Sequence, residues 1–238
     1  RGRGLVGGNT RFQNNTVSTS DNTYFAVYSA IYGVSIEAGV STSYDHRDYK
    51  IVGNEFHGLT AGVLASGYSA ASPTVKKLLI AHNHDIVSAS GTSYPGTLAS
   101  LTNVQGVIIE GNVVGQPGLL TTATAVSLSG VTHAVLRGNL VMNTNVTAYG
   151  ISDSNQISIS DTFRDVGKGS TGNQAILLWN SQNVSVVGSS AVQTGSYAAT
   201  FLQEAGGSNF NAANANFVRG FTTKYIPAGA NTTFGTLN

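Results

Sequence analysis

One short stretch of this sequence is rich in titratable side chains. Tyr44, Asp45, His46, Arg47 and Asp48 are contiguous, although charged residues make up only 10% of the chain. A histidine or tyrosine can take up or release a proton, and an arginine can stabilise the negative charge that develops when a proton leaves a substrate. We therefore predict catalytic roles for Tyr44, Asp45, His46 and Arg47.

The elements that position this stretch belong to a repeat that covers most of the chain. Its clearest copy runs from Val107 to Val114, with Asn112 as its anchor. The same position holds, in chain order, Asn54, Asn83, Asn112 and Asn139, and then Thr162 and Ser189. Successive anchors are 29, 29, 27, 23 and 27 residues apart. Such a period is typical of a solenoid, in which each repeat forms one coil.

Apolar residues recur at fixed distances from the anchors. Three residues before them stand Ile51, Ile80, Ile109, Leu136, Ile159 and Val186. Further upstream, apolar pairs two residues apart recur, such as Val126 with Leu128. A spacing of two is the period of a strand, so one side chain in two should point inward. Stacked coils bring residues of equal position to about 4.8 Å, so the asparagines should form a column at a bend.

This Val/Ile-x-Gly-Asn pattern, as in Ile51 to Asn54, resembles the right-handed parallel β-helix of the pectin-lyase-like superfamily, which includes pectate lyases, alginate epimerases and phage tailspikes. The resemblance covers roughly Phe12 to Phe217. It implies an all-β, right-handed parallel β-helix, a solenoid of about eight coils of 23–29 residues. The helix is predicted over residues 1–219, with 220–238 as a closing strand and tail. A last coil around Phe210 would need an alanine at its anchor.

Two neighbouring coils are longer than the others at the same place. The extra residues of the first fall within Ser41 to Asp48, and those of the second fall within Gly67 to Thr74. Loops on adjacent coils should lie side by side and form one wall of a groove along the rod. Loops on a rigid scaffold are the usual place for function.

The resemblance also implies a ligand class, an anionic polysaccharide. Arg47, Lys76 and Lys77 would neutralise a uronate carboxylate, which lowers the cost of removing the neighbouring C5 proton. His46 or Tyr44 would act as base or acid. Alginate epimerases are similar in carrying a tyrosine, an aspartate and a histidine in a loop that enters a strand. Here the three residues are contiguous, and no Asp-Pro-His sequence occurs.

Five further residues are predicted to bind the substrate: Asp48, Lys76, Lys77, Tyr68 and Trp179. Trp179 follows the inward position of Leu178, so it should project outward. There it could stack on a sugar ring, or a partner subunit or the C-terminal tail could cover it. For the charged residues the alternative is a merely polar loop, in which Asp48 and Lys77 form a surface ion pair.

The composition of the sequence argues against several other classes of function. The net charge of +1 gives no argument for binding nucleic acid or a membrane. The absence of cysteine excludes disulfides, thiol catalysis and zinc-thiolate sites. No run approaches the roughly 18 apolar residues of a membrane-spanning helix. The sequence predicts no metal site and no cofactor.

Two functions follow from these observations. The first is an extracellular β-helix protein that recognises or processes a polysaccharide, as a lyase, epimerase or depolymerase if it is an enzyme. The second is a non-catalytic structural or receptor-binding rod, such as part of a tailspike or surface adhesin, which could be a homotrimer. In both cases the expected location is secreted, on a cell surface or on a virion. The sequence leaves catalysis open.

Overall fold

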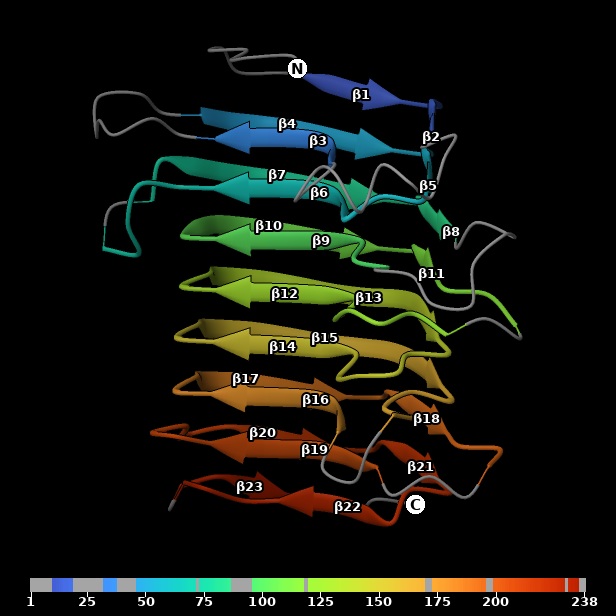
Figure 1. Cartoon of the computed structure of the whole chain (residues 1–238). Coiled ribbons are helices and arrows are strands. Elements are labelled where there is room, and N and C mark those ends of the chain that lie inside the picture. The colour runs from blue at the N-terminus through green and yellow to red at the C-terminus, as the bar shows by residue number, and fades with distance from the viewer. Residues whose placement is uncertain are drawn as a thin grey trace.

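The structure is a computed structural model that describes residues 10–18, 32–37, 46–71, 73–86, 96–117, 120–169, 173–195, 199–229 and 231–235. Its strands pair in parallel and stack into a rod, with the blue N-terminal strands at one end and the red C-terminal strands at the other (Figure 1). This arrangement confirms the predicted all-β, parallel β-helix. In the described part of the chain, no helix has the length and apolar character needed to cross a membrane.

The strands form two sheets that make three faces of the rod. The front face is the eight-stranded sheet of β3 (Tyr32–Glu37), β6 (Ala61–Ser66), β9 (Ala99–Thr102), β12 (Val126–Ser129), β14 (Tyr149–Ser152), β16 (Gln174–Trp179), β19 (Thr200–Ala205) and β22 (Thr223–Ile226). The back face consists of β1 (Arg11–Gln13), β4 (His46–Val52), β7 (Val75–Ala81), β10 (Val104–Glu110), β13 (Thr132–Met142), β15 (Asn155–Arg164), β17 (Gln182–Val187), β20 (Ala212–Asn214) and β23 (Thr233–Phe234). The third face consists of β2 (Thr16–Ser18), β5 (Glu55–His57), β8 (His84–Ile86), β11 (Val113–Val114), β18 (Ser190–Val192) and β21 (Phe217–Arg219), together with the ends of β13 and β15, which bend into it.

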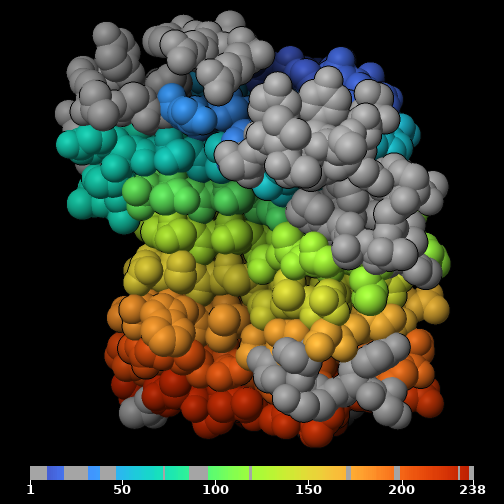
Figure 2. Space-filling view, viewed as in Figure 1, coloured from blue at the N-terminus to red at the C-terminus, as the bar shows by residue number. Residues whose placement is uncertain are grey.

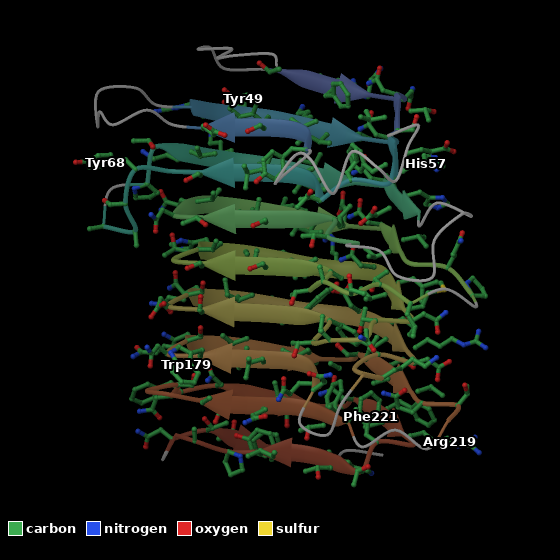
Figure 3. The ribbon with its side chains drawn as sticks, in the orientation of Figure 1. Tyr49, His57, Tyr68, Trp179, Arg219 and Phe221 are labelled. Carbon is green, nitrogen blue, oxygen red and sulfur yellow. The ribbon has the colours of Figure 1, made fainter. Side chains whose placement is uncertain are left out.

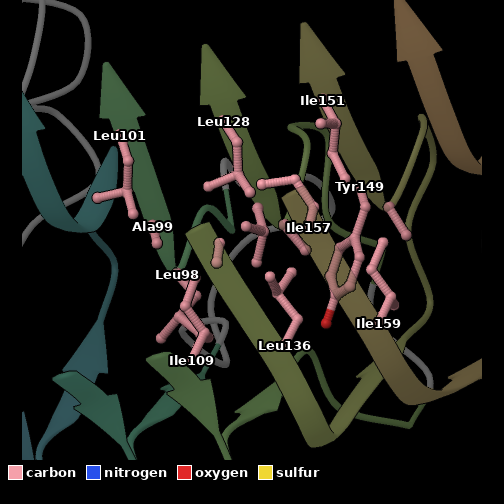
Figure 4. Close-up of a cluster of buried hydrophobic side chains, with 14 of the residues drawn as sticks. Leu98, Ala99, Leu101, Ile109, Leu128, Leu136, Tyr149, Ile151, Ile157 and Ile159 are labelled. Atoms are coloured by element: carbon pink, nitrogen blue, oxygen red, sulfur yellow. The ribbon is translucent and has the colours of Figure 1, made fainter. Parts of the chain in front are cut away.

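The apolar columns expected from the sequence fill the interior. Ile80 pairs with Ile109 on the back face, and Leu128 pairs with Leu101 and Ile151 on the front face (Figure 4). All five side chains are 1% exposed or less. Burial of each such side chain contributes about 1.5–3 kcal/mol, so every coil step is stabilised. In the space-filling view the coils accordingly stack as even bands (Figure 2).

A ladder of buried amides marks the bend between the back and third faces. Asn112 Oδ1 accepts hydrogen bonds from Asn83 N (2.8 Å) and Asn83 Nδ2 (3.0 Å) of the preceding coil. Asn112 Nδ2 donates to Asn139 Oδ1 of the next coil (2.9 Å) and to Ile80 O (3.0 Å). Asn54 Nδ2 makes the equivalent bond to Asn83 Oδ1 at 2.9 Å. The predicted asparagine column is therefore confirmed from Asn54 to Asn139.

The next anchor was predicted wrongly, because Asp161 and not Thr162 fills it. The coil that starts at Asn139 is 22 residues long, one fewer than the predicted spacing. A carboxylate accepts the same bonds as an amide oxygen: Asp161 Oδ1 lies 2.7 Å from Asn139 N and 3.0 Å from Asn139 Nδ2. Tyr149 OH donates to Asp161 Oδ2 at 2.9 Å. Burial nevertheless raises the pKa of Asp161 to about 6.

The last coil is more regular than the sequence indicated. Its anchor is Asn216 and not an alanine, since Asn216 Oδ1 accepts a bond from Ser189 N at 2.8 Å. The rod has about six regular turns, fewer than the eight coils expected, with incomplete coils at its ends. Beyond Arg219, β22 pairs with β19 and β23 pairs with β20. The division into a helix of 1–219 and a closing segment of 220–238 stays a prediction.

A buried carboxylate ties these final strands to the rod. Glu204 occupies an inward position, in register with Leu178, and is 2% exposed. Its Oε1 accepts hydrogen bonds from Asn211 Nδ2 (2.6 Å) and Thr232 Oγ1 (2.9 Å), and its Oε2 accepts one from Tyr225 OH (2.7 Å). Because the three donors come from different strands or loops, this one side chain holds the C-terminal segment against the interior.

Candidate functional site

The front face connects to the back face at a sharp corner that carries most of the predicted site residues. Near the start of the back-face strands, one outward position forms a column of polar side chains in register: Arg47, Lys76, Gln105, Thr132, Asn155, Gln182 and Asn209. We call this column, together with Asp48, Tyr68, Lys77, Asp153, Trp179, Asn180, Asn183 and Phe210, the polar corner.

Two features of the backbone hold the polar corner in shape. Inside it is a second buried ladder, in which Ser154 N donates to Ser181 Oγ at 3.3 Å and Ser181 N donates to Ser208 Oγ at 3.1 Å. Outside it, one residue per coil has a positive φ, for example Lys77 (55°) and Asn183 (54°). The bend at this residue turns two consecutive side chains outward. Polar groups are therefore concentrated at this corner.

The N-terminal end of the polar corner is cationic. Arg47 and Lys76 are register partners on adjacent strands, so their side chains start about 4.8 Å apart. Lys77 Nζ lies 3.7 Å from Asp48 Oδ1, and both side chains are solvent-accessible. The expected surface ion pair is therefore present, and the cationic column of Arg47 and Lys76 stands next to it.

The predicted catalytic cluster falls largely outside the described residues. This applies to Tyr44, to Asp45 and to the side chain of His46. The flanking strands do show where the two insertions begin and end, because β3 pairs with β6 and β4 pairs with β7. Both insertions therefore leave and re-enter the rod at the polar corner. The catalytic roles of Tyr44, Asp45, His46 and Arg47 stay predictions.

The C-terminal end of the polar corner is aromatic. Trp179 ends β16 and is 50% exposed, in keeping with the outward position expected for it. Its register neighbours Ser152 and Ala205 are small, so they cover little of the indole. One coil further, Phe210 is 56% exposed and has a φ of 56°, which bulky residues rarely adopt. The fold thus presents two aromatic rings to solvent on neighbouring coils.

Tyr68 and Trp179 lie along the same edge of the rod, the left edge in Figure 3. Tyr68 is 49% exposed, and its backbone N–H donates to Thr74 Oγ1 at 2.9 Å within the insertion. Four coil steps, about 19 Å, separate the two aromatic residues. A register column of small hydroxyl side chains fills this distance: Ser66, Thr102, Ser129 and Ser152. The structure therefore places Tyr68 near the cationic end and Trp179 well away from it.

Hydrogen-bonded polar pairs cross from coil to coil at the aromatic end. Asn180 Nδ2 donates to Asp153 Oδ1 at 3.3 Å, and Asn183 Nδ2 donates to Asn155 Oδ1 at 2.8 Å. Each pairing holds its side chains in place but uses only part of their bonding capacity. The remaining N–H groups and lone pairs can bond to the hydroxyl groups of a ligand.

Sequence reasoning missed Phe210 as a member of this surface. It placed the residue in a coil without a polar anchor. Asn216 lies 27 residues after Ser189, which is an ordinary coil spacing. That spacing, applied to Asn183, would have put Phe210 at the same corner one coil later.

The carboxylates with strongly raised pKa values lie inside the rod. Burial raises the pKa of Asp85 to about 7. Asp85 occupies the inward column of the third face, between Phe56 and Val114, and its Oδ2 has no hydrogen-bond partner among the described residues. In the same part of the chain, no group of three or more histidine, aspartate or glutamate side chains is placed to hold a metal ion.

No protein-family model and no curated protein matches this chain. Solved structures do resemble it. The A-modules of the mannuronan C-5 epimerases AlgE4 and AlgE6 of Azotobacter vinelandii give TM-scores of 0.46 and 0.47 at 10% identity, over 79% and 80% of this chain and 64% and 63% of theirs. Tailspike protein 2 of an Escherichia coli bacteriophage gives 0.37 at 14% identity, over 88% of this chain and 39% of its own. This chain thus spans less than two thirds of the length of each.

These similarities concern the fold. The strand pairing of the chain itself defines its class, a parallel β-helix protein. Its particular features are the polar corner, with one cationic and one aromatic end, and the hydroxyl column between them.

Proposed function

We propose that the polar corner binds a polysaccharide whose chain runs along the axis of the rod. The observation that supports this best is the exposure of Trp179 and Phe210 on neighbouring coils, beside the Asn180–Asp153 and Asn183–Asn155 pairs. An aromatic ring can stack on the apolar face of a sugar, while polar groups held in place bond to its hydroxyls and fix its orientation.

The fold itself gains little from the two aromatic rings. A half-exposed side chain contributes to stability only part of the roughly 1.5–3 kcal/mol that full burial contributes. The left-handed backbone at Phe210 costs about 1–2 kcal/mol. The same left-handed turn recurs in the other coils, for example at Lys77 and Asn183, so it belongs to the fold. A ligand that covers Trp179 and Phe210 would account for the exposure of their rings.

The length and charge of the polar corner support a long, acidic ligand. The column from Arg47 to Asn209 covers six coil steps, about 29 Å. A linear polymer repeats its hydroxyl groups along its length, as the corner repeats its polar side chains. Arg47 and Lys76 are two cations in register on adjacent coils, and an acidic sugar carries the opposite charge. We propose that the protein is located outside the cell or on a virion, where it would encounter such polymers.

The alternative, a rod that associates with copies of itself, has one observation in its favour. Ile108 and Val135 are register partners on the back face and are 38% and 36% exposed. If this apolar pair is the centre of a homotrimer contact, light scattering should give three times the monomer mass. Ile108→Asp should then return the protein to a monomer without changing polysaccharide binding.

The test of polysaccharide binding uses the only tryptophan in the chain as its reporter. Trp179 fluorescence is recorded while polygalacturonate, alginate and neutral dextran are added in turn. We expect a saturable change in intensity or emission wavelength with at least one polymer. Trp179→Ala and Phe210→Ala should each weaken binding about tenfold in calorimetry, because stacking of a sugar on an aromatic ring resembles the roughly 1–3 kcal/mol of base stacking.

Phe217→Ala is the matched control. Phe217 is 49% exposed but lies on the third face, so its removal should leave affinity unchanged. Equal losses for Phe217→Ala and Phe210→Ala, or no binding to any polymer, would overturn the proposal.

A further inference from the structure

The third face carries two hollows that meet at one arginine. The first, of about 280 Å³, is lined by Thr162, Phe163, Arg164, Val192 and Thr194. The second, of about 250 Å³, is lined by Pro117, Met142, Asn143, Arg164, Asp165 and Lys168. We call the two together the Arg164 groove. Its lining comes from four successive coils: Pro117 follows β11, and Met142, Arg164 and Val192 are register neighbours on the next three coils.

Among the described residues, the guanidinium of Arg164 has one acidic partner, Asp165, at a long distance. Its Nε lies 3.9 Å from Asp165 Oδ2, which is too long for a hydrogen bond, and the side chain is 62% exposed. Asp165 is committed elsewhere: its Oδ1 accepts bonds from Thr194 N (2.7 Å) and Thr194 Oγ1 (2.9 Å), and the residue is 7% exposed. The planar guanidinium of Arg164 can therefore bind a carboxylate or sulfate, which arginine holds with two parallel hydrogen bonds.

A second cation borders the groove. Lys168 lines the second hollow, with Nζ 3.3 Å from Asn143 Oδ1. Arg219 follows Val192 in the same register column, so it lies two coil steps, about 10 Å, from Arg164. Figure 3 shows Arg219 on the edge of the rod opposite to Tyr68 and Trp179. The positive charge here is thus separate from the cationic end of the polar corner.

The other lining groups suit the apolar face of a sugar ring. Met142, Val192 and Pro117 offer apolar contacts, and the wall of the first hollow is almost wholly apolar. Each hollow approaches the roughly 300 Å³ at which ligand pockets begin, and Arg164 lines both. A small inorganic anion would use the charge but not these apolar surfaces.

We infer that the Arg164 groove is a second binding site, for an acidic saccharide unit whose carboxylate or sulfate pairs with Arg164. This site does not depend on the polysaccharide function of the polar corner. On a long acidic glycan, the two sites would hold different chains or different segments of one chain.

Short ligands test this inference. Trigalacturonate carries carboxylates, a chondroitin sulfate disaccharide carries a sulfate, and maltotriose is neutral. Calorimetry should show binding of one or both acidic ligands and none of maltotriose, and comparison of the two acidic ligands identifies the preferred oxyanion. Arg164→Ala should weaken that binding about tenfold or more, the usual effect of losing a charge-assisted pair.

Arg137→Ala is the matched control for charge. Its side chain has the same 62% exposure, but Arg137 is paired with Glu110 at 2.7 Å on the back face, away from the Arg164 groove. We expect Arg137→Ala to bind as the unmodified protein does. Equal weakening by both substitutions would mean that net charge alone drives binding, and no effect of Arg164→Ala would place the ligand elsewhere; either result overturns the inference.

The two proposals can fail separately. In a Trp179→Ala background the polar corner loses its main stacking group, whereas binding that depends on Arg164 should persist. Loss of short-ligand binding in that background would assign it to the polar corner and refute the Arg164 groove. Circular dichroism of each variant confirms that the coils are intact.

Discussion

The asparagine ladder makes a quantitative prediction at Asn112. Asn112→Ala removes an acceptor from Asn83 N and Asn83 Nδ2, and a donor from Ile80 O. Asn83 and Asn112 are fully buried, so water cannot replace these bonds without opening the coil. Each unsatisfied buried group costs about 1–3 kcal/mol. Allowing for partial relaxation, we expect a loss of about 3–6 kcal/mol, a large share of the roughly 5–15 kcal/mol by which proteins are stable.

Urea denaturation followed by circular dichroism measures this loss. The slope of the transition must be compared as well as its midpoint, because a solenoid can unfold part by part. Asn155→Ala is the control: it removes one hydrogen bond at the surface, from Asn183 Nδ2, and should cost less than about 1 kcal/mol. If Asn112→Ala costs no more than Asn155→Ala, the buried amide ladder does not stabilise the rod.

Three further predictions concern buried groups. Burial raises the pKa of Asp85 from 3.8 to about 7, so the folded state holds this proton more tightly than the unfolded state; the resulting stability is present below about pH 4 and is lost as the pH rises through 7. Asp85→Asn should therefore stabilise the protein by about 3–4 kcal/mol at pH 8 and by little at pH 4, and equal midpoints at pH 8 would contradict this. Tyr149→Phe removes the donor to Asp161 Oδ2 and should cost about 1–3 kcal/mol in urea denaturation at pH 8, whereas an unchanged midpoint would show that the bond is not needed. Glu204→Ala should release the C-terminal strands, seen as faster amide hydrogen exchange in β22 with unchanged exchange in β14, and uniform exchange would argue against a local role.

The sequence by itself determined the coil, its strands and most of its columns. Stacked coils pair residues of equal repeat position, so the match between Ile80 and Ile109, and the ladder from Asn54 to Asn139, could be derived from spacing alone. The outward position of Trp179 followed from strand alternation in the same way. These features depend on the order of residues within one coil, which the sequence states directly.

Only the tertiary structure decided which side chains of different coils meet. The shorter coil after Asn139 moved the anchor to Asp161, and a regular last coil brought Phe210 to the polar corner, one coil beyond Asn183. The Arg164 groove likewise depends on how the ends of four third-face strands, β11, β13, β15 and β18, are stacked. Differences in turn length and register between coils accumulate along the rod. A repeat pattern in the sequence describes the average coil and does not contain these differences. The side chains that form a surface across several coils are therefore set by the folded chain as a whole.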